Sequence, residues 1–165
     1  MRGFLIELGV NINELKGFIV EANGQGYGAG DEKTREKQDD GSMTIKYERG
    51  KWKMVDNYVG GEPFCGMTKI FFKGKVVWSM VYYGLVDKKV NGFEEVYNFL
   101  MKSLLQMPGD YPYRGPKELV NEDWKYKNEW KGEIEEFNGE EKIYFKNEMI
   151  FWTKYIGGLV DVRGE

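Results

Sequence analysis

The chain has 165 residues, of which 41% are hydrophobic and 31% charged, and a net charge of −3 with both signs interspersed. This length and composition predict a single domain, 1–165, with a real core, and they exclude a disordered chain, a collagen-like fibre and a multidomain assembly. The charge argues against a surface that follows nucleic-acid phosphates, and no apolar run is long enough for a membrane span or a secretory signal.

A short helix over 11–22 is the first predicted element. Asn11 or Asn13 can cap it, and its apolar side chains recur at helical spacing on one face: Leu15, Phe18, Ile19 and Ala22. The pair Asn23-Gly24 is predicted to end this helix, because glycine is common just after a helix C-terminus.

A glycine-rich run, Gly24–Gly30, follows that helix. It formally fits a dinucleotide-binding fingerprint, but such a fingerprint follows a strand and opens a helix, so we expect a flexible lid with Tyr27 packing down. Eight of the eleven residues of Asp31–Gly41 are charged, which predicts an exposed, mobile loop.

An alternation of apolar and polar residues begins at Met43 and predicts β-structure. Strands are expected at four places: 43–47, 52–58, 64–72 and 76–83. Most of the connections are short, such as Arg49-Gly50 and Lys73-Gly74-Lys75. Short turns favour an antiparallel meander.

A stronger helix is predicted at 93–104, where apolar residues recur three and four positions apart. Pro108 closes it, and two further prolines stiffen the loop 107–116. The rest of the chain is predicted to be β-structure again, in four strands: 124–130, 133–137, 142–146 and 149–156.

The two β-rich parts of the chain resemble each other. Six residues recur at an offset of 73: Phe64, Gly66, Lys69, Ile70, Phe72 and Lys73 are followed by Phe137, Gly139, Lys142, Ile143, Phe145 and Lys146. Internal duplication, with halves of about 11–90 and 91–165, is one interpretation. Convergence of two strand-rich segments of similar composition is the other.

These elements predict an α+β fold: two antiparallel β-meanders, in one curved sheet or two abutting ones, with two helices packed on the sheet. The strand 76–83 is apolar on both faces, with Trp78 and Tyr82 on one and Val81 and Tyr83 on the other. Both faces therefore need cover. Burial in a curved sheet is one explanation, and a partner chain or a ligand cavity is the other.

Absent residue types exclude several kinds of site. The chain has no histidine, so Ser-His-Asp catalysis, Cys-His catalysis and imidazole-based metal sites are excluded. Its one cysteine, Cys65, cannot form an internal disulfide, which indicates a reducing, cytoplasmic setting. Catalysis by carboxylates, Tyr or Lys stays open, but no catalytic residue, metal site or cofactor is assigned. The 19 Lys and 19 Glu give a thermophile-like composition.

Arg114 lies in the proline-stiffened loop, where its guanidinium could be held toward a carboxylate or a phosphate of a ligand. An ordinary Arg–Glu ion pair that ties the loop down is the alternative. Glu62, in the turn Gly60–Pro63, could be the partner of Arg114 or a second polar group in a pocket.

Three motifs occur in order along the chain: YVGGEPFCG at Tyr58–Gly66, WSMVYYG at Trp78–Gly84 and PYRGP at Pro112–Pro116. Together they resemble an uncharacterised prokaryotic domain family, over about Leu15 to Val160. The family occurs alone or fused behind a helix-turn-helix module in bacterial regulators, and it brings no established activity. The fusion implies sensing or interaction rather than turnover. Because this chain lacks the helix-turn-helix part, direct nucleic-acid binding is not expected.

We therefore expect a ligand-binding or regulatory module with an aromatic cleft for a small apolar or planar molecule that carries an anionic group. The predicted ligand-binding residues are Tyr58, Glu62, Trp78, Tyr82, Tyr83, Tyr113 and Arg114. One alternative is a homodimeric interaction domain whose second apolar sheet face pairs with a copy of itself. The other is an enzyme that uses Glu62 with a tyrosine. No membrane partner is expected.

Overall fold

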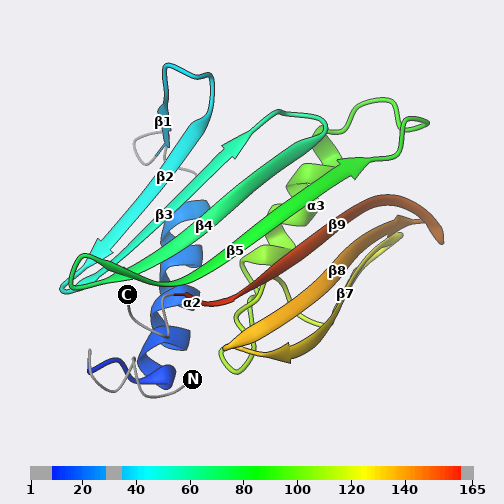
Figure 1. The fold of residues 1–165 in the computed structure, drawn as a ribbon. Helices are drawn as coiled ribbons and strands as arrows, with labels where there is room; N and C mark the ends of the chain where they lie inside the picture. Colours follow the sequence, from blue (N-terminus) through cyan, green and yellow to red (C-terminus); the bar gives the residue numbers. More distant parts are fainter. Residues whose placement is uncertain (1–8, 29–34, 161–165) are drawn as a thin grey trace.

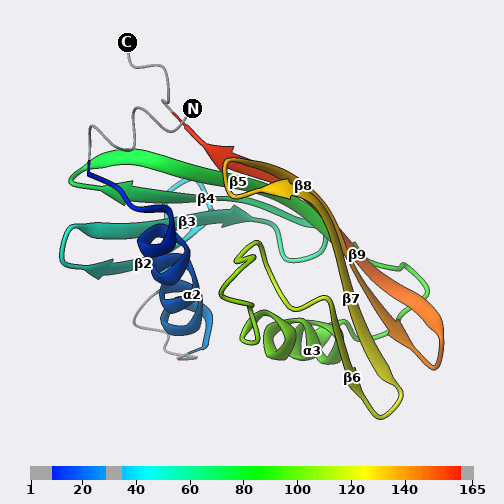
Figure 2. The same cartoon turned by 90° about the horizontal axis from the view of Figure 1, so that it is seen from below.

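The protein has an α+β fold, described by a computed structural model for residues 9–28 and 35–160. In the described part, two helices, α2 (Ile12–Gly28) and α3 (Glu94–Leu104), lie on one side of an antiparallel sheet (Figures 1 and 2). The strands of the first part are β1 (Arg35–Lys37), β2 (Met43–Arg49), β3 (Trp52–Val59), β4 (Phe64–Phe72) and β5 (Lys75–Val86). Those of the second part are β6 (Glu118–Asn121), β7 (Trp124–Glu133), β8 (Glu136–Phe145) and β9 (Glu148–Leu159).

These nine strands form one sheet in the order β1-β2-β3-β4-β5-β9-β8-β7-β6, and every neighbouring pair is antiparallel. The pairing of β5 with β9 joins the strands before α3 to those after it. The result is a single curved sheet rather than two abutting ones, with its concave side toward the helices (Figure 2).

Side chains alternate between the two faces of this sheet. On β5, Trp78 and Tyr82 are buried on the inner face, under the helices, whereas Val81 and Tyr83 on the outer face are 39% and 45% exposed. No helix of the described chain covers the outer face (Figure 2). The expectation that both faces of this strand need cover is thus met on one side by the helices. No described helix or strand of this chain packs on the other side.

Helix α2 continues into the glycine run, as far as Gly28, so the predicted end at Asn23-Gly24 is wrong. Asn23 donates a hydrogen bond from Nδ2 to the carbonyl of Leu104 at 2.7 Å, which ties α2 to the end of α3. A Cβ atom on Gly26 would lie only 3.0 Å from Met54 Cε, so this glycine lets the helix approach the sheet closely. Tertiary packing outweighs the low helix propensity of glycine here.

The charged segment Asp31–Gly41 is not a loop throughout. Residues 35–37 form the edge strand β1, which pairs with β2 in register Arg35↔Ile45. Exposed charges are common on edge strands, because they discourage pairing with other chains, and a composition signal alone cannot separate such an edge from a loop. The lid expected over Gly24–Gly30 falls partly on residues 29–34, which lie outside the described residues.

The later strands also differ from the prediction in two places. Residues 136–137 and 142–145 of the two predicted strands belong to one strand, β8, whereas Glu133 ends β7 and 134–135 form the turn between β7 and β8; β6 was not predicted at all. The predicted break at 138–141 is absent: Glu141 is buried and hydrogen-bonded inside β8, so its polarity marks an internal network rather than a loop.

Two hairpins turn tightly at positions that need a left-handed backbone. Lys73 and Gly74 have φ values of 49° and 82°, and Lys146 and Asn147 have 49° and 69°. Two such residues in succession connect twisted antiparallel strands in a two-residue turn.

No helix of the described residues combines the length and apolar composition needed to cross a bilayer.

Candidate functional site

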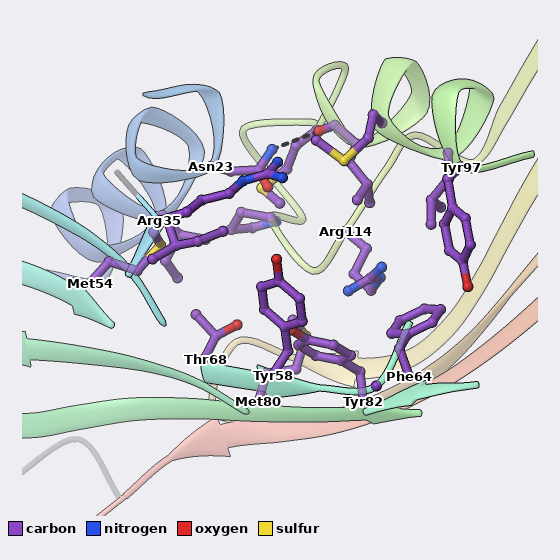
Figure 3. A pocket seen from close by; sticks show the side chains of 18 of the residues that line it. Asn23, Arg35, Met54, Tyr58, Phe64, Thr68, Met80, Tyr82, Tyr97 and Arg114 are labelled. Carbon is purple, nitrogen blue, oxygen red and sulfur yellow. Dashed lines mark hydrogen bonds between the residues drawn. The ribbon is translucent and has the colours of Figure 1, made fainter. Parts of the chain in front are cut away.

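A cavity of about 470 Å³ lies between the inner face of β2–β5 and the two helices (Figure 3). This volume falls in the range of about 300–1,000 Å³ usual for small-molecule sites. Its apolar lining comes from the sheet (Ile45, Met54, Phe64, Ile70, Trp78, Met80), from α2 (Ile19) and from α3 and the loop after it (Leu100, Met101, Leu104, Met107).

Methionine is prominent in this wall. Four of the eight methionines of the chain line the cavity: Met54, Met80, Met101 and Met107. An unbranched thioether side chain adapts to the shape of what it packs against. The shape of this part of the wall is therefore adaptable.

A buried carboxylate lies beneath one side of the cavity. Asp56 is fully buried, and its oxygens accept hydrogen bonds from Thr68 Oγ1 at 2.7 Å and from Tyr82 Oη at 3.0 Å. Thr68 and Tyr82 both line the cavity, and Asp56 itself does not. The carboxylate thus fixes these two polar side chains in the cavity wall without lining the cavity itself.

Gly66 makes the Tyr82 contact possible. It is the cross-strand neighbour of Tyr82, and a Cβ atom on it would lie 2.3 Å from the Tyr82 hydroxyl oxygen. The tyrosine side chain therefore lies flat across the strand at this position. This geometry explains why the motif that ends at Gly66 needs a residue without a side chain there.

Arg114 is buried and forms an ion pair inside the protein. Its Nε lies 2.5 Å from Oε2 of Glu141, which is fully buried, and its guanidinium stacks 5.0 Å from the centroid of the Tyr82 ring. The Arg–Glu pair expected as the alternative is therefore present, with Glu141 rather than Glu62. Arg114 still lines the cavity (Figure 3).

The loop that carries Arg114 is fixed by a network on β7. Gly115 donates its backbone N–H to Tyr126 Oη at 3.1 Å and accepts a hydrogen bond from Asn128 Nδ2 at 3.0 Å. Tyr126 donates in turn to Glu141. Burial and the charge of Glu141 raise the pKa of Tyr126 well above its ordinary value, so its hydroxyl stays protonated.

Glu62 lies beside the cavity and is held by two donors. Its Oε1 accepts the backbone N–H of Val86 at 2.9 Å, and its Oε2 accepts the hydroxyl of Tyr97 at 2.5 Å. Burial and this hydrogen bond raise the pKa of Tyr97, so the phenol remains a donor at neutral pH. The contact ties α3 to the turn after β3, in which the Glu62-Pro63 peptide bond is cis.

The predicted site residues therefore separate into three groups. Tyr58, Trp78, Tyr82 and Arg114 line the cavity together. Glu62 does not line the cavity but binds Tyr97, which does. The other two lie elsewhere: Tyr113 is fully buried against Phe137, with ring centroids 4.0 Å apart, and Tyr83 is on the outer face.

Several cavity residues were missed by sequence reasoning. The apolar face of the predicted helix 93–104 lines the cavity with Tyr97, Leu100 and Met101, and it also packs into the core, where Leu100 is buried. Arg35 lies in the segment Asp31–Gly41, which was predicted to be a loop. Asp56, Thr68 and Glu141 belong to none of the three sequence motifs. The strand positions of the last three, inside otherwise apolar faces, are the signal that could have found them.

The outer face carries a second concave region. An open groove there is lined mainly by side chains of β3, β4, β5 and β9: Asn57, Val59, Cys65, Met67, Val81, Tyr83, Lys154 and Ile156. Met67, Val81 and Ile156 are direct cross-strand neighbours and are 39–56% exposed. Exposed apolar side chains that touch one another in this way are typical of an interaction surface.

The described residues contain no group of three or more Cys, Asp or Glu side chains placed to hold a metal ion.

A family model described as "Domain of unknown function (DUF5680)" matches residues 56–160. All three sequence motifs lie inside this range, which begins later than the expected Leu15; the fusion to a helix-turn-helix module stays a prediction. The searches of curated proteins and of solved structures found no match.

Proposed function

The chain belongs to the DUF5680 family, whose description assigns no activity, and we propose that it is a small-molecule-binding, effector-sensing module. The observation that carries the proposal is the cavity of about 470 Å³ with an apolar wall and a few fixed polar groups. A concave, largely apolar site with few polar groups is the usual form of a ligand site.

The polar groups of the wall support this proposal. Thr68 and Tyr82 are held by Asp56, and Asn23 is held by the carbonyl of Leu104, so these side chains need no reordering when a ligand enters.

The first test is native mass spectrometry of the protein together with binding of the apolar dye anilinonaphthalene sulfonate. We expect a co-purified small molecule, or dye binding to the emptied cavity. Met101→Trp fills the cavity and should abolish dye binding, whereas the neighbouring Lys102→Trp, on the exposed side of α3, should not. Dye binding that is equal in both variants, with both folded by circular dichroism, would contradict the proposal.

The internal duplication is part of this proposal. Register breaks occur at Ile70/Phe71 and at Ile143/Tyr144. A Cβ on Gly66 would meet the Tyr82 hydroxyl, and one on Gly139 would meet the Tyr155 hydroxyl, at 2.3 and 2.2 Å. All of these positions recur at the offset of 73. The correspondence of irregular features supports duplication more strongly than alternation of apolar residues does, because irregularities are not required by a strand as such.

A second candidate function, self-association, is supported by the exposed apolar groove on the outer face. Its occupant is a second copy of this chain. The groove lies across the midline of the sheet, on β3, β4, β5 and β9; Lys154 on β9 lines it, and Glu140 on β8 is the cross-strand neighbour of Lys154. An apolar centre with a mixed charged rim is the anatomy of an interface, and a net charge of −3 gives little repulsion between copies.

Sedimentation velocity tests this second function. The wild-type chain should sediment as a concentration-dependent dimer, and Val81→Glu should convert it to a monomer. Lys127→Glu changes the charge of the outer face on β7, outside the groove, and should leave the dimer intact. A wild-type monomer at all concentrations would exclude self-association through this face.

A further inference from the structure

The charges around the cavity indicate what its ligand carries. Among the described residues that line it, two are cationic, Arg35 and Arg114, and none is acidic. A cavity whose lining holds guanidinium groups and no carboxylate favours an anion, since Arg presents paired N–H donors that fit a carboxylate. The two arginines differ, however, in what else they contact.

Arg114 already has an ionic partner. Its Nε is 2.5 Å from the Glu141 carboxylate, and Glu141 is itself fully buried. A ligand anion placed beside Arg114 would therefore also lie near a buried carboxylate of the same sign. Like charges at short distance in a poorly solvated site repel strongly, so Arg114 is a poor receptor for an anion even though it lines the cavity.

Arg35 is placed differently. It pairs in register with Ile45, a fully buried residue of the inner face, so its side chain lies on the cavity side of β1. The next residue, Glu36, points to the other side, where it binds Lys46 at 2.6 Å. No ion pair within the described residues involves Arg35, and its side chain is exposed. Figure 3 shows it reaching toward Asn23 above the cavity.

The geometry points to an amphiphilic carboxylate as the ligand, bound with its apolar body inward among the methionines and its carboxylate outward beside Arg35. This inference rests on the proposed function and adds the ligand class, its orientation and a specificity-determining residue. The apolar wall takes the body of the molecule, and the exposed guanidinium at the mouth takes its charge. A carboxylate at the mouth of the cavity also keeps its contact with water, whereas a buried position beside Glu141 would remove that solvation.

The test compares decanoate with decanol, which share a chain length and differ in charge, by titration calorimetry at low salt. Wild-type protein should bind decanoate about fivefold more tightly than decanol, the size of an exposed ion pair. Arg35→Gln should remove this preference with little change for decanol. Lys37→Gln, on the same face of β1, should keep the preference.

The results separate this inference from the proposed function. Equal affinity for decanoate and decanol, or an unchanged preference in Arg35→Gln, would overturn the carboxylate inference while leaving the cavity a binding site. Failure of both amphiphiles to bind to a protein that still binds the dye would overturn the inference in the same way. Failure of the dye as well, with the chain folded, would overturn both proposals.

Discussion

The two parts of the sheet place similar polar residues at matching strand positions and use them differently. On the inner face of β3–β5 these are Asp56, Thr68 and Tyr82; on β7–β9 the positions 72 or 73 residues later hold Asn128, Glu141 and Tyr155. Beside the first set lies a cavity. Over the second set lies the loop that carries Arg114, which Glu141 binds.

The difference shows that the same arrangement of strands can either line a cavity or form part of a packed core. Around Glu141, donors from the loop and from β7 bind its carboxylate, and Tyr113 fills the adjacent space by stacking on Phe137. Around Thr68 and Tyr82, the Asn23–Leu104 hydrogen bond joins α2 to the end of α3, and the two helices do not fill the space over the sheet. The loop 107–117, rather than the strands, therefore determines which part of the sheet has its inner face filled by packed side chains.

The strongest test of this comparison removes the Arg114–Glu141 ion pair, which lies over β7–β9. Arg114→Met should destabilise the fold by about 3–5 kcal/mol, because it leaves the carboxylate of Glu141 buried without its cation. Adding Glu141→Gln should recover a large share of that loss. Urea unfolding at neutral pH measures both. An effect no larger than that of Arg35→Met, an exposed arginine, would show that the loop is not held by this pair.

Two matched glycine substitutions separate stability from binding. Gly66→Ala and Gly139→Ala should each cost about 1–3 kcal/mol, since a Cβ would collide with a tyrosine hydroxyl in both places. Only Gly66→Ala displaces a residue of the cavity wall, Tyr82, so only this variant should weaken dye binding. Equal losses of dye affinity in the two variants would show that the two parts are not functionally distinct.

Alkaline pH should destabilise the part of the sheet formed by β7–β9 through its buried tyrosines. Burial raises the pKa values of Tyr126 and Tyr155 above the ordinary value of 10.0, with Glu141 adding to the effect. The unfolded chain therefore ionises first, so this stability is present below pH 10 and is lost as the pH rises, by about 1.4 kcal/mol per unit and per tyrosine. Tyr126→Phe should reduce the slope of unfolding free energy against pH. An unchanged slope would rule out Tyr126 as a source.

The smallest effect is expected on the outer face. Val81→Thr should change the free energy of unfolding of the monomer by about 0.5 kcal/mol or less, because Val81 is 39% exposed. Met80→Thr, its neighbour on the inner face, should cost more. Comparing the two by thermal unfolding at low protein concentration measures the difference between the faces. A large effect of Val81→Thr would mean that the outer face is covered in solution.

Local pattern predicted most of the elements. Alternation gave β2 to β5 with nearly their observed bounds, and helical spacing gave α3. Failures occurred where a residue is used against its usual preference. Gly24 and Gly26 lie inside α2 because the helix packs closely on the sheet, and Glu141 lies inside β8 because a network satisfies it.

The candidate site was predicted in part. Aromatic residues and Arg114 in the motifs led to Tyr58, Trp78, Tyr82 and Arg114, which share the cavity. Tyr83, one position from Tyr82, lies on the opposite face because strand side chains alternate. Tyr113 is used for packing. Arg35 could not be found, because a charged edge strand and a charged loop have the same composition.

The amino-acid sequence by itself determined the fold class, most of the strands and the absence of imidazole chemistry, because each follows from local periodicity or from residue types alone. Only the tertiary structure decided which apolar face is packed and which encloses space, since that depends on where a loop and two helices lie across a shared sheet. It also decided that Arg114 meets Glu141, a contact between residues on different strands and loops that no spacing in the chain encodes.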